Sequence, residues 1–287
     1  MWLQVIINGL LIGGFFASTA MGFSIVWGVM DVVNSAHGAF IMLGAYVTYG
    51  LHTMLGLDPF LSIPISMLVL FIIGFLTQKY IVNLIMKTAV SMSFVLTWGL
   101  DILLINIALV LFTANWRSVS PSYAGAHWAI GTATVSYIRA GVLIVSVLLM
   151  FGLSYFMSRT KMGKAILATA FDKDAARLVG VNIGHIYAVT LGIGSALAGA
   201  AGSLTSMIYP ISPQLGVTLI AKAFVVTALG GLGDMRGVIA GGLVLGFAES
   251  LGVALLGPEY QMALDVLMLV AMLILRPQGI LGKKYYG

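Results

Sequence analysis

The sequence predicts an all-α polytopic membrane protein with about eight transmembrane helices (a range of about 8–10), one or two of them broken or re-entrant. Of its 287 residues, 60% are hydrophobic and only 8% are charged, whereas a soluble domain carries about 25% charged residues. Because so few charges cannot cover a surface that faces water, lipid must surround most of the molecule. Glycine occurs 35 times, and small residues let helices pack closely in a membrane.

Apolar runs long enough to cross a bilayer follow one another along the chain, since about 18 or more such residues mark a candidate crossing. The first run is longer than the core of a secretory signal and has no basic residue before it, so we expect a retained helix. The runs 36–55 and 217–232 are short or interrupted by glycine, and either could be discontinuous or re-entrant. The runs are 4–29, 36–55, 60–78, 89–112, 138–157, 183–208, 217–232, 237–256 and 260–276.

The basic residues predict the orientation, because cytosolic loops carry an excess of lysine and arginine. If the long connection 158–182 is cytosolic, alternation places 79–90, 233–236 and the C-terminus on the same side. The N-terminus then lies outside, on the side that holds Arg117 and Arg139. The cytosolic side holds Lys79, Lys87, Arg159, Lys161, Lys164, Lys173, Arg177, Arg236, Arg276, Lys283 and Lys284.

Residues 1–287 are interpreted as a single membrane domain with one notable outer loop, 113–137. This loop is rich in aromatic residues, which often lie at the membrane interface. An interfacial belt is the simpler interpretation, and a docking site for a partner is the alternative. The residues concerned are Trp116, Tyr123, Trp128 and Tyr137.

The segment 158–182 is the one long charged connection. Its composition predicts a short helix over 164–178, with Arg177 in the last turn and Gly180 as the C-terminal cap. Ile166 and Leu178 are expected to face apolar surface. Two interpretations stay open: an amphipathic helix that rests on lipid headgroups, or a docking helix that fits a groove on a soluble partner.

Polar residues also occur within the apolar runs, where charges are costly. Lys222 is expected to reach back to the membrane surface or to form a structural pair. For Asp101 and Glu249 we expect a structural pair or hydrogen-bonded cluster in preference to a substrate site, and for Asp265 a solvated group near the outer end. Asn34 is expected to cap the helix that begins near His37, or else to mark a backbone break open to a substrate.

Glycines recur in both halves of the chain. Residues 36–50 and 235–249 look alike, because each has a polar break and a glycine before an apolar helix; this is consistent with a repeat, which transporters often contain. Packing is the simpler role for these glycines, and hinges are the alternative. The positions concerned in the second half are Gly230, Gly231, Gly233 and Gly237.

Several classes of function are disfavoured. The chain has no cysteine and four scattered histidines, so no disulfide framework or metal site is expected. No nucleophile–base arrangement or pair of catalytic carboxylates stands out. The net charge of +5 comes from residues at the ends of the apolar runs, so it does not indicate a nucleic acid partner. The nearest string to a phosphate-binding loop, at Gly163 and Lys164, lacks the required hydroxyl and upstream glycine.

Three stretches, in the right order, resemble the branched-chain amino acid ABC transporter permeases, and the form of the first points to the LivH-type subunit. The first is Asn-x-Ala-His-Gly followed by Gly-Ala-Tyr, the second is the loop motif, and the third begins Lys-Ala-Phe and runs through glycines to glutamate. The matching positions are Asn34, Ala36, His37, Gly38, Gly44, Ala45, Tyr46, Gly163, Asp172, Ala175, Ala176, Leu178, Gly180, Val181, Asn182, Lys222, Phe224, Gly230, Gly231, Gly233, Gly237, Gly241 or Gly242, Gly246 and Glu249.

The resemblance implies the permease subunit of an importer in a bacterial or archaeal inner (cytoplasmic) membrane. Its partners would be a second, LivM-type permease, two cytosolic ATPases that hold ATP and magnesium, and an extracytoplasmic binding protein; this chain would carry no cofactor. The resemblance implies a coupling helix that docks into the ATPase. The implied coupling residues are Asp172, Ala175, Ala176, Arg177, Leu178 and Gly180, and the candidates for the translocation path are Asn34, His37, Gly38, Tyr46, Asp101, Lys222 and Glu249.

The substrate class follows only in outline. Branched-chain amino acids are the first expectation for this family, and other amino acids, small amides and urea are carried by relatives. Ser35 departs from the family, in which an aromatic residue is usual, and it could alter the lining near His37. A secondary transporter or channel that uses Asp101, Lys222 and Glu249 as coupling sites is the alternative function.

Overall fold

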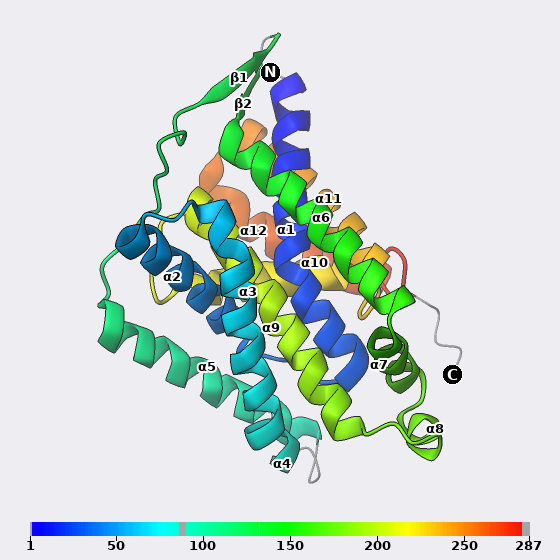
Figure 1. The fold of residues 1–287 in the computed structure, drawn as a ribbon. Coiled ribbons are helices and arrows are strands. Elements are labelled where there is room, and N and C mark those ends of the chain that lie inside the picture. The colour runs from blue at the N-terminus through cyan, green and yellow to red at the C-terminus, as the bar shows by residue number, and fades with distance from the viewer. Residues whose placement is uncertain (1, 86–89, 132, 283–287) are drawn as a thin grey trace.

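The computed structural model describes residues 2–85, 90–131 and 133–282 and consists of a bundle of long helices (Figure 1). Lys87, Lys283 and Lys284, which entered the orientation argument, lie outside these residues. Within them, eight helices are long and apolar enough to cross a membrane, which confirms the predicted fold class. The elements are α1 (Trp2–Met30), α2 (His37–Leu55), α3 (Pro59–Thr77), η1 (Gln78–Val82), α4 (Asn83–Ile85), α5 (Val90–Phe112), β1 (His127–Ile130), β2 (Ala133–Ser136), α6 (Tyr137–Arg159), α7 (Lys161–Phe171), α8 (Lys173–Leu178), α9 (Ile183–Ile208), α10 (Leu215–Gly230), α11 (Met235–Leu255), η2 (Pro258–Tyr260) and α12 (Gln261–Leu275).

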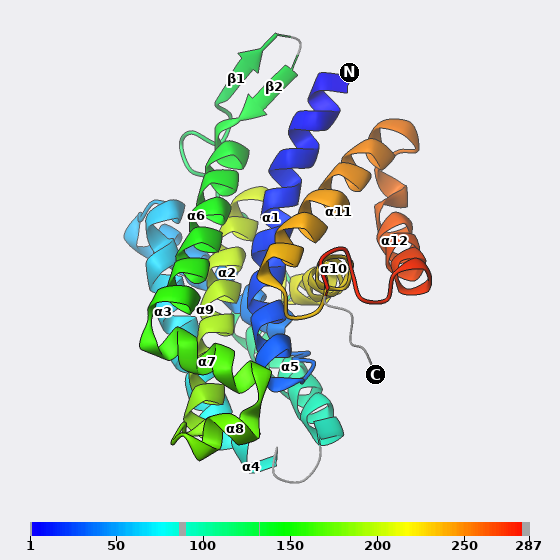
Figure 2. The same ribbon diagram turned by 90° about the vertical axis from the view of Figure 1, so that its right-hand side faces the viewer.

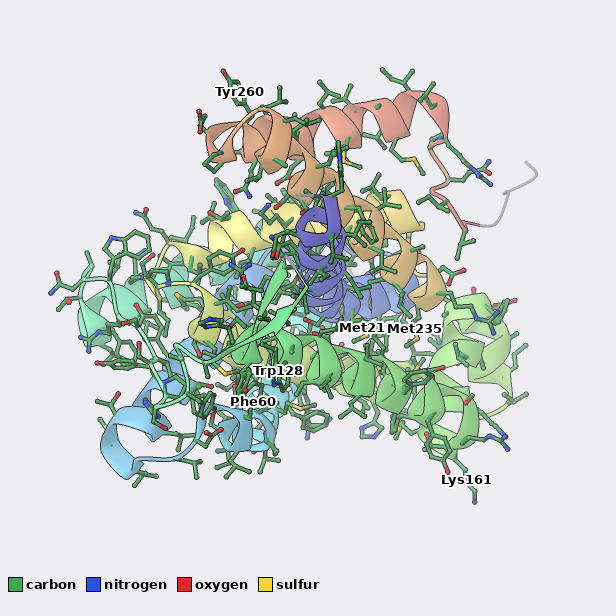
Figure 3. All side chains as sticks on the ribbon, turned by 90° about the horizontal axis from the view of Figure 1, so that it is seen from above. Met21, Phe60, Trp128, Lys161, Met235 and Tyr260 are labelled. Carbon is green, nitrogen blue, oxygen red and sulfur yellow. The ribbon has the colours of Figure 1, made fainter. Side chains whose placement is uncertain are left out.

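Helix α1 lies at the centre of the bundle. It has 29 residues and is apolar on every side, so no face of it favours water. Seen from above, α11 and α12 lie on one side of α1 and α6 lies on the other (Figure 3). Glycine lets α1 and α11 touch: a Cβ added to Gly13 would lie 2.9 Å from the Cα atom of Leu243, closer than such atoms approach.

Helices α2, α3 and α9 form a second tightly packed group. A Cβ on Gly44 of α2 would lie 2.6 Å from the Cα atom of Gly199 of α9, so only glycine fits at this crossing. Buried hydroxyl groups add hydrogen bonds across the same contacts, as when Thr48 donates to Ser203 at 2.8 Å. Small residues and such hydrogen bonds hold helices together in lipid, where the hydrophobic effect does not.

Helix α10 lies across the bundle, and Figures 1 and 2 show it nearly perpendicular to α1 and α9. Its 16 residues span about 24 Å at 1.5 Å per residue, less than the roughly 30 Å of a hydrocarbon core. The prediction that 217–232 is a short segment is therefore confirmed. Glycine pairs fix both ends: Gly216 touches the backbone of Gly38, and Gly230 touches the backbone of Gly237.

The segment 36–55 is not broken internally, so the alternative of a discontinuous helix there is wrong. Helix α2 runs without interruption for 19 residues, and the irregular backbone precedes it, at 31–36. Helix α11 likewise follows an irregular stretch, 231–234. The two look-alike segments thus share a break followed by a helix, while a true repeat stays a prediction.

Different secondary-structure elements lie at the two ends of the bundle. The N-terminus of α1 and the β1–β2 hairpin lie at one end, and α4, α7 and α8 lie at the other (Figures 1 and 2). The antiparallel hairpin was not predicted, because its strands of four residues each fall inside the loop that the aromatic residues mark. Gln4 anchors it to α1, because its side chain accepts a hydrogen bond from the Thr134 backbone N–H at 2.8 Å.

The aromatic residues of the outer loop divide into exposed and packed groups. Trp116 and Trp128 are 70% and 52% exposed, as an interfacial belt requires. Tyr123 instead packs inward and donates to a carboxylate oxygen of Asp58 at 2.7 Å. Burial, and then this hydrogen bond, raises the pKa of Tyr123 above its usual range. Asp58 in turn caps α3 by accepting from the Phe60 backbone N–H at 2.9 Å.

Candidate functional site

The charged connection between α6 and α9 forms two helices. A single helix over 164–178 was the prediction, and it is wrong because Asp172 ends α7 and caps α8. Its Oδ1 accepts hydrogen bonds from the backbone N–H groups of Asp174 and Ala175, both at 2.9 Å. An aspartate side chain competes for nearby backbone donors in this way and so favours helix starts over helix interiors.

Helix α8 ends at Leu178, and its C-cap is Val179, so Gly180 lies one residue beyond the cap position that was predicted for it. Gly180 has φ +89°, a conformation that glycine adopts without strain. The backbone N–H of Gly180 donates to Arg177 at 3.0 Å, and that of Val181 donates to Ala176 at 3.1 Å, which closes the carbonyl end of the helix.

Helix α8 and the residues beside it expose apolar side chains at the protein surface. Leu178, Val179 and Phe171 are 89%, 80% and 79% exposed, whereas Ala176 is 4% exposed and anchors the helix. Ile166 of α7 is fully buried, so it faces apolar surface as expected, whereas the apolar surface expected for Leu178 is not part of the described chain and stays a prediction. We call Phe171 together with α8, Val179 and Gly180 the α8 knob. Exposed apolar groups among the charges of Asp172, Lys173, Asp174 and Arg177 are typical of a protein-binding surface.

The irregular stretch before α2 gathers the polar residues of the first motif. Its chain reverses at Asp31, which has φ +54°. Asn34 does not cap α2, because the cap position belongs to Ala36; instead Asn34 Oδ1 accepts from the Ala36 backbone N–H at 3.2 Å. Thr97 of α5 braces the stretch by hydrogen bonds to Ser35 and Val33, each 3.2 Å long.

Asn34 and His37 are closed off in this conformation. They are 3% and 1% exposed. His37 Nε2 lies 2.9 Å from the Thr19 carbonyl oxygen, so this nitrogen carries the proton. Within the described residues, His37 Nδ1 and Asn34 Nδ2 have no hydrogen-bond partner. Buried polar groups without partners are costly. In another conformation these two nitrogens could form hydrogen bonds with a substrate or with water.

The other candidates on or near α2 are also enclosed. Tyr46 is 2% exposed and stacks on Phe112 with ring centroids 4.2 Å apart. Asp101 on α5 is partly buried. Among the described residues its carboxylate forms no ion pair, so the structural pair or hydrogen-bonded cluster expected for Asp101 stays a prediction.

Lys222 and Glu249 do come together. Lys222 of α10 forms an ion pair with Glu249 of α11 and a second one with Asp265 of α12, at 2.8 Å. We call these three side chains the charge cluster. Their exposed fractions are 16%, 3% and 8%, so the structural pair predicted for Lys222 and Glu249 is confirmed.

Asp265 is not the solvated group that the sequence predicted. It is the one buried residue of helix α12, whose other residues are exposed or partly buried, and this helix lies at the edge of the bundle (Figure 3). Phe16 of α1 was also missed; its ring lies 4.7 Å from the Lys222 ammonium. An aspartate in the middle of an apolar run was the signal for Asp265, because membrane carboxylates need a partner.

The glycines of the third motif pack against backbone. A Cβ on Gly233 would lie 2.7 Å from the Cα atom of Gly28 of α1, and one on Gly231 would lie 2.7 Å from the Gly282 nitrogen. Gly230 and Gly237 touch each other. These contacts support packing, the simpler of the two roles predicted for these glycines.

Comparison with known proteins decides the family. A sequence model described as the permease component of the branched-chain amino acid transport system matches residues 5–274. The chain belongs to this family. It is therefore a membrane-embedded permease and not an enzyme, and ATP hydrolysis in such systems takes place on partner ATPases.

Curated relatives of the permease cover nearly its full length. The high-affinity branched-chain amino acid transport system permease protein BraD of Pseudomonas aeruginosa is 33% identical, over 98% of this chain and 96% of the relative. LivH of Escherichia coli is 32% identical over the same shares. The probable LivH of Methanocaldococcus jannaschii is 26% identical, over 97% of this chain and 92% of the relative.

A solved structure, PsaBC from Streptococcus pneumoniae in complex with Fab, is 18% identical with a TM-score of 0.47, over 96% of this chain and 92% of that one. A match at this level identifies no function. The full-length relatives carry the assignment of the permease to ABC importers, which implies a partner permease, ATPases and a binding protein in general.

Proposed function

We propose that this permease pairs with a LivM-type permease to form the path by which branched-chain amino acids enter the cell. Two cytosolic ATPases, which bind ATP and magnesium, would drive the path through the α8 knob. A binding protein outside the membrane would deliver the substrate. The N-terminus and the hairpin would then face outside, and the C-terminus would face the cytosol, as the distribution of basic residues favours.

The observation that carries this proposal is the α8 knob. Its apolar side chains are exposed although its backbone is fixed at both ends by Asp172 and Gly180. A short helix that is capped at both ends, and that α7 and residues 179–182 connect to the transmembrane helices α6 and α9, can transmit a push from a partner. Helix α7 supports this role, because Ile166 is buried and Thr160 caps its start by accepting from the Gly163 backbone N–H at 2.9 Å.

The experiment is uptake of labelled leucine into proteoliposomes that hold the complete importer, with ATP inside and binding protein outside. Leu178→Asp places a charge on the apolar surface of the knob and should abolish uptake and ATPase co-purification, while membrane insertion is retained. The matched control is Leu256→Asp, also an exposed leucine (56%), which follows α11 at the other end. Normal ATP-driven uptake by Leu178→Asp would refute the docking role.

The substrate is tested in the same vesicles. Unlabelled leucine, isoleucine and valine should compete with labelled leucine, whereas urea and small amides should not. If only urea or small amides competed, the substrate of this permease would be one of those compounds, which relatives in the family carry, and not a branched-chain amino acid. Uptake by this chain alone, driven by a proton or sodium gradient without ATP, would favour the secondary transporter.

A further inference from the structure

The charge cluster carries an unbalanced charge. Lys222 contributes one positive charge, and Glu249 and Asp265 contribute two negative charges when both are ionised. Glu249 and Asp265 are buried and Lys222 is partly buried, on helices rich in apolar residues, where an uncompensated charge is disfavoured. The nearby Phe16 ring presents its negative face to the ammonium and does not offset the second carboxylate.

The same cluster leaves one oxygen without a partner. Asp265 Oδ2 accepts from the Lys222 ammonium at 2.8 Å, but within the described residues Oδ1 of this carboxyl group has no hydrogen-bond partner. Asp265 is 6% exposed, so bulk water does not replace the missing bond. A buried carboxylate oxygen without a donor is costly. This cost is separate from that of the surplus negative charge.

The carboxyl groups of Glu249 and Asp265 both contact the same ammonium, that of Lys222, so they lie close to one another. Two carboxylates at this separation repel each other, and one shared proton turns the repulsion into a hydrogen bond. We propose that the charge cluster binds one proton from solution, held between Glu249 and Asp265, so that the cluster is neutral. The proton comes from bulk water and forms one O–H bond with a carboxyl oxygen. It cancels the surplus negative charge, and the hydrogen bond that it makes gives the unpaired oxygen of Asp265 a partner.

The other groups that face the cluster do not supply this charge. Tyr209, which follows α9, and Arg139 of α6 are the other titratable or charged groups that act electrostatically in this region. Arg139 is exposed and lies at the outer end of α6. Helix α1 contributes the Phe16 ring, and Lys222 is the residue of α10 that enters the cluster. The proton is therefore the missing cation, and it requires no coordination shell in so tight a space.

The consequence is that proton release and folding are linked. If the folded protein holds a proton that the unfolded chain releases at neutral pH, stability falls as the pH rises. Glutamine at position 249 or asparagine at 265 resembles the protonated carboxyl group in shape and charge. Either substitution should therefore remove this dependence on pH.

The test uses the complete importer in lipid nanodiscs, with infrared spectra and thermal unfolding recorded as the pH is raised. The wild type should show the C=O band of a protonated carboxylic acid at neutral pH, and this band should disappear at high pH together with a fall in the midpoint of unfolding. Glu249→Gln and Asp265→Asn should lack the band and its pH dependence. Glu259→Gln, which alters an exposed carboxylate nearby, should behave as the wild type.

The proposal would be overturned by a wild-type spectrum without the acid band at neutral pH, or by a band that persists in both Glu249→Gln and Asp265→Asn. The wild-type spectrum alone decides the matter if a variant does not assemble. Neither measurement involves transport, so the result is independent of the substrate and of ATPase docking.

Discussion

Replacement of Asp172 by alanine should uncouple ATP hydrolysis from transport without unfolding the permease. Asp172 Oδ1 satisfies two backbone N–H groups at the start of α8, and the loss of such a cap costs about 1 kcal/mol. Helix α8 has six residues and its buried side chain is Ala176, so packing does little to compensate. An isolated helix of this length is unstable.

The expected magnitude follows from this free energy. About 1 kcal/mol lowers the population of folded α8 roughly five-fold relative to its unfolded form. Leucine uptake should fall by at most this factor, because the folded fraction of α8 changes less than the ratio does, while the midpoint of thermal unfolding stays unchanged because α8 lies at the end of the bundle (Figure 2). Asp172→Asn should retain most uptake, because asparagine also caps helices.

Asp174→Ala is the matched control. It removes the same charge two residues away, but Asp174 makes only an exposed ion pair with Arg177, 3.6 Å long, and such pairs contribute little. Uptake is measured in proteoliposomes at equal permease content. Equal uptake by Asp172→Ala and Asp174→Ala would refute the role of the cap.

Three further substitutions test the fold. Lys222→Met should lower the free energy of unfolding by about 3–5 kcal/mol, measured by denaturation in detergent, because the buried carboxyl pair of Glu249 and Asp265 loses its counter-ion; a change below about 0.5 kcal/mol would contradict the ion pairs. Gly44→Leu should prevent folding, measured as loss of monodisperse protein, because its side chain would meet the Gly199 backbone; Gly50→Ala, where the added Cβ meets nothing within 4 Å, should be neutral. Tyr123→Phe should cost about 1 kcal/mol at neutral pH. Since the pKa of Tyr123 is raised, its hydrogen bond contributes fully below about pH 10 and is lost as the pH rises further, so the two proteins should converge at high pH.

Composition and the length of the apolar runs were enough to predict the helical fold, because lipid admits few alternatives to helices. The short α10 was visible as a run too brief to cross. The hairpin was missed because its strands lie in an exposed loop, where apolar patterning carries little information. The single helix over 164–178 was wrong because helix propensity favoured continuation, while the Asp172 side chain competed successfully for backbone donors.

The candidate site was predicted in part. The sequence placed Lys222 and Glu249 among the functional residues, and the structure joins them. Asp265 was assigned to solvent because its depth was counted along the chain, whereas its surroundings depend on how α12 packs against α10 and α11. The spacing of residues along the chain does not show which side chains of different helices will lie next to one another.

Labelling of a cysteine at position 178 tests most directly whether the α8 knob meets an ATPase in the cytosol. The chain has no native cysteine, so a membrane-impermeant maleimide reports on Leu178→Cys alone. We expect no labelling in intact cells, labelling in inverted vesicles stripped of ATPase, and protection when the ATPase is restored. Labelling from outside intact cells, or labelling that the ATPase does not reduce, would contradict the proposed coupling.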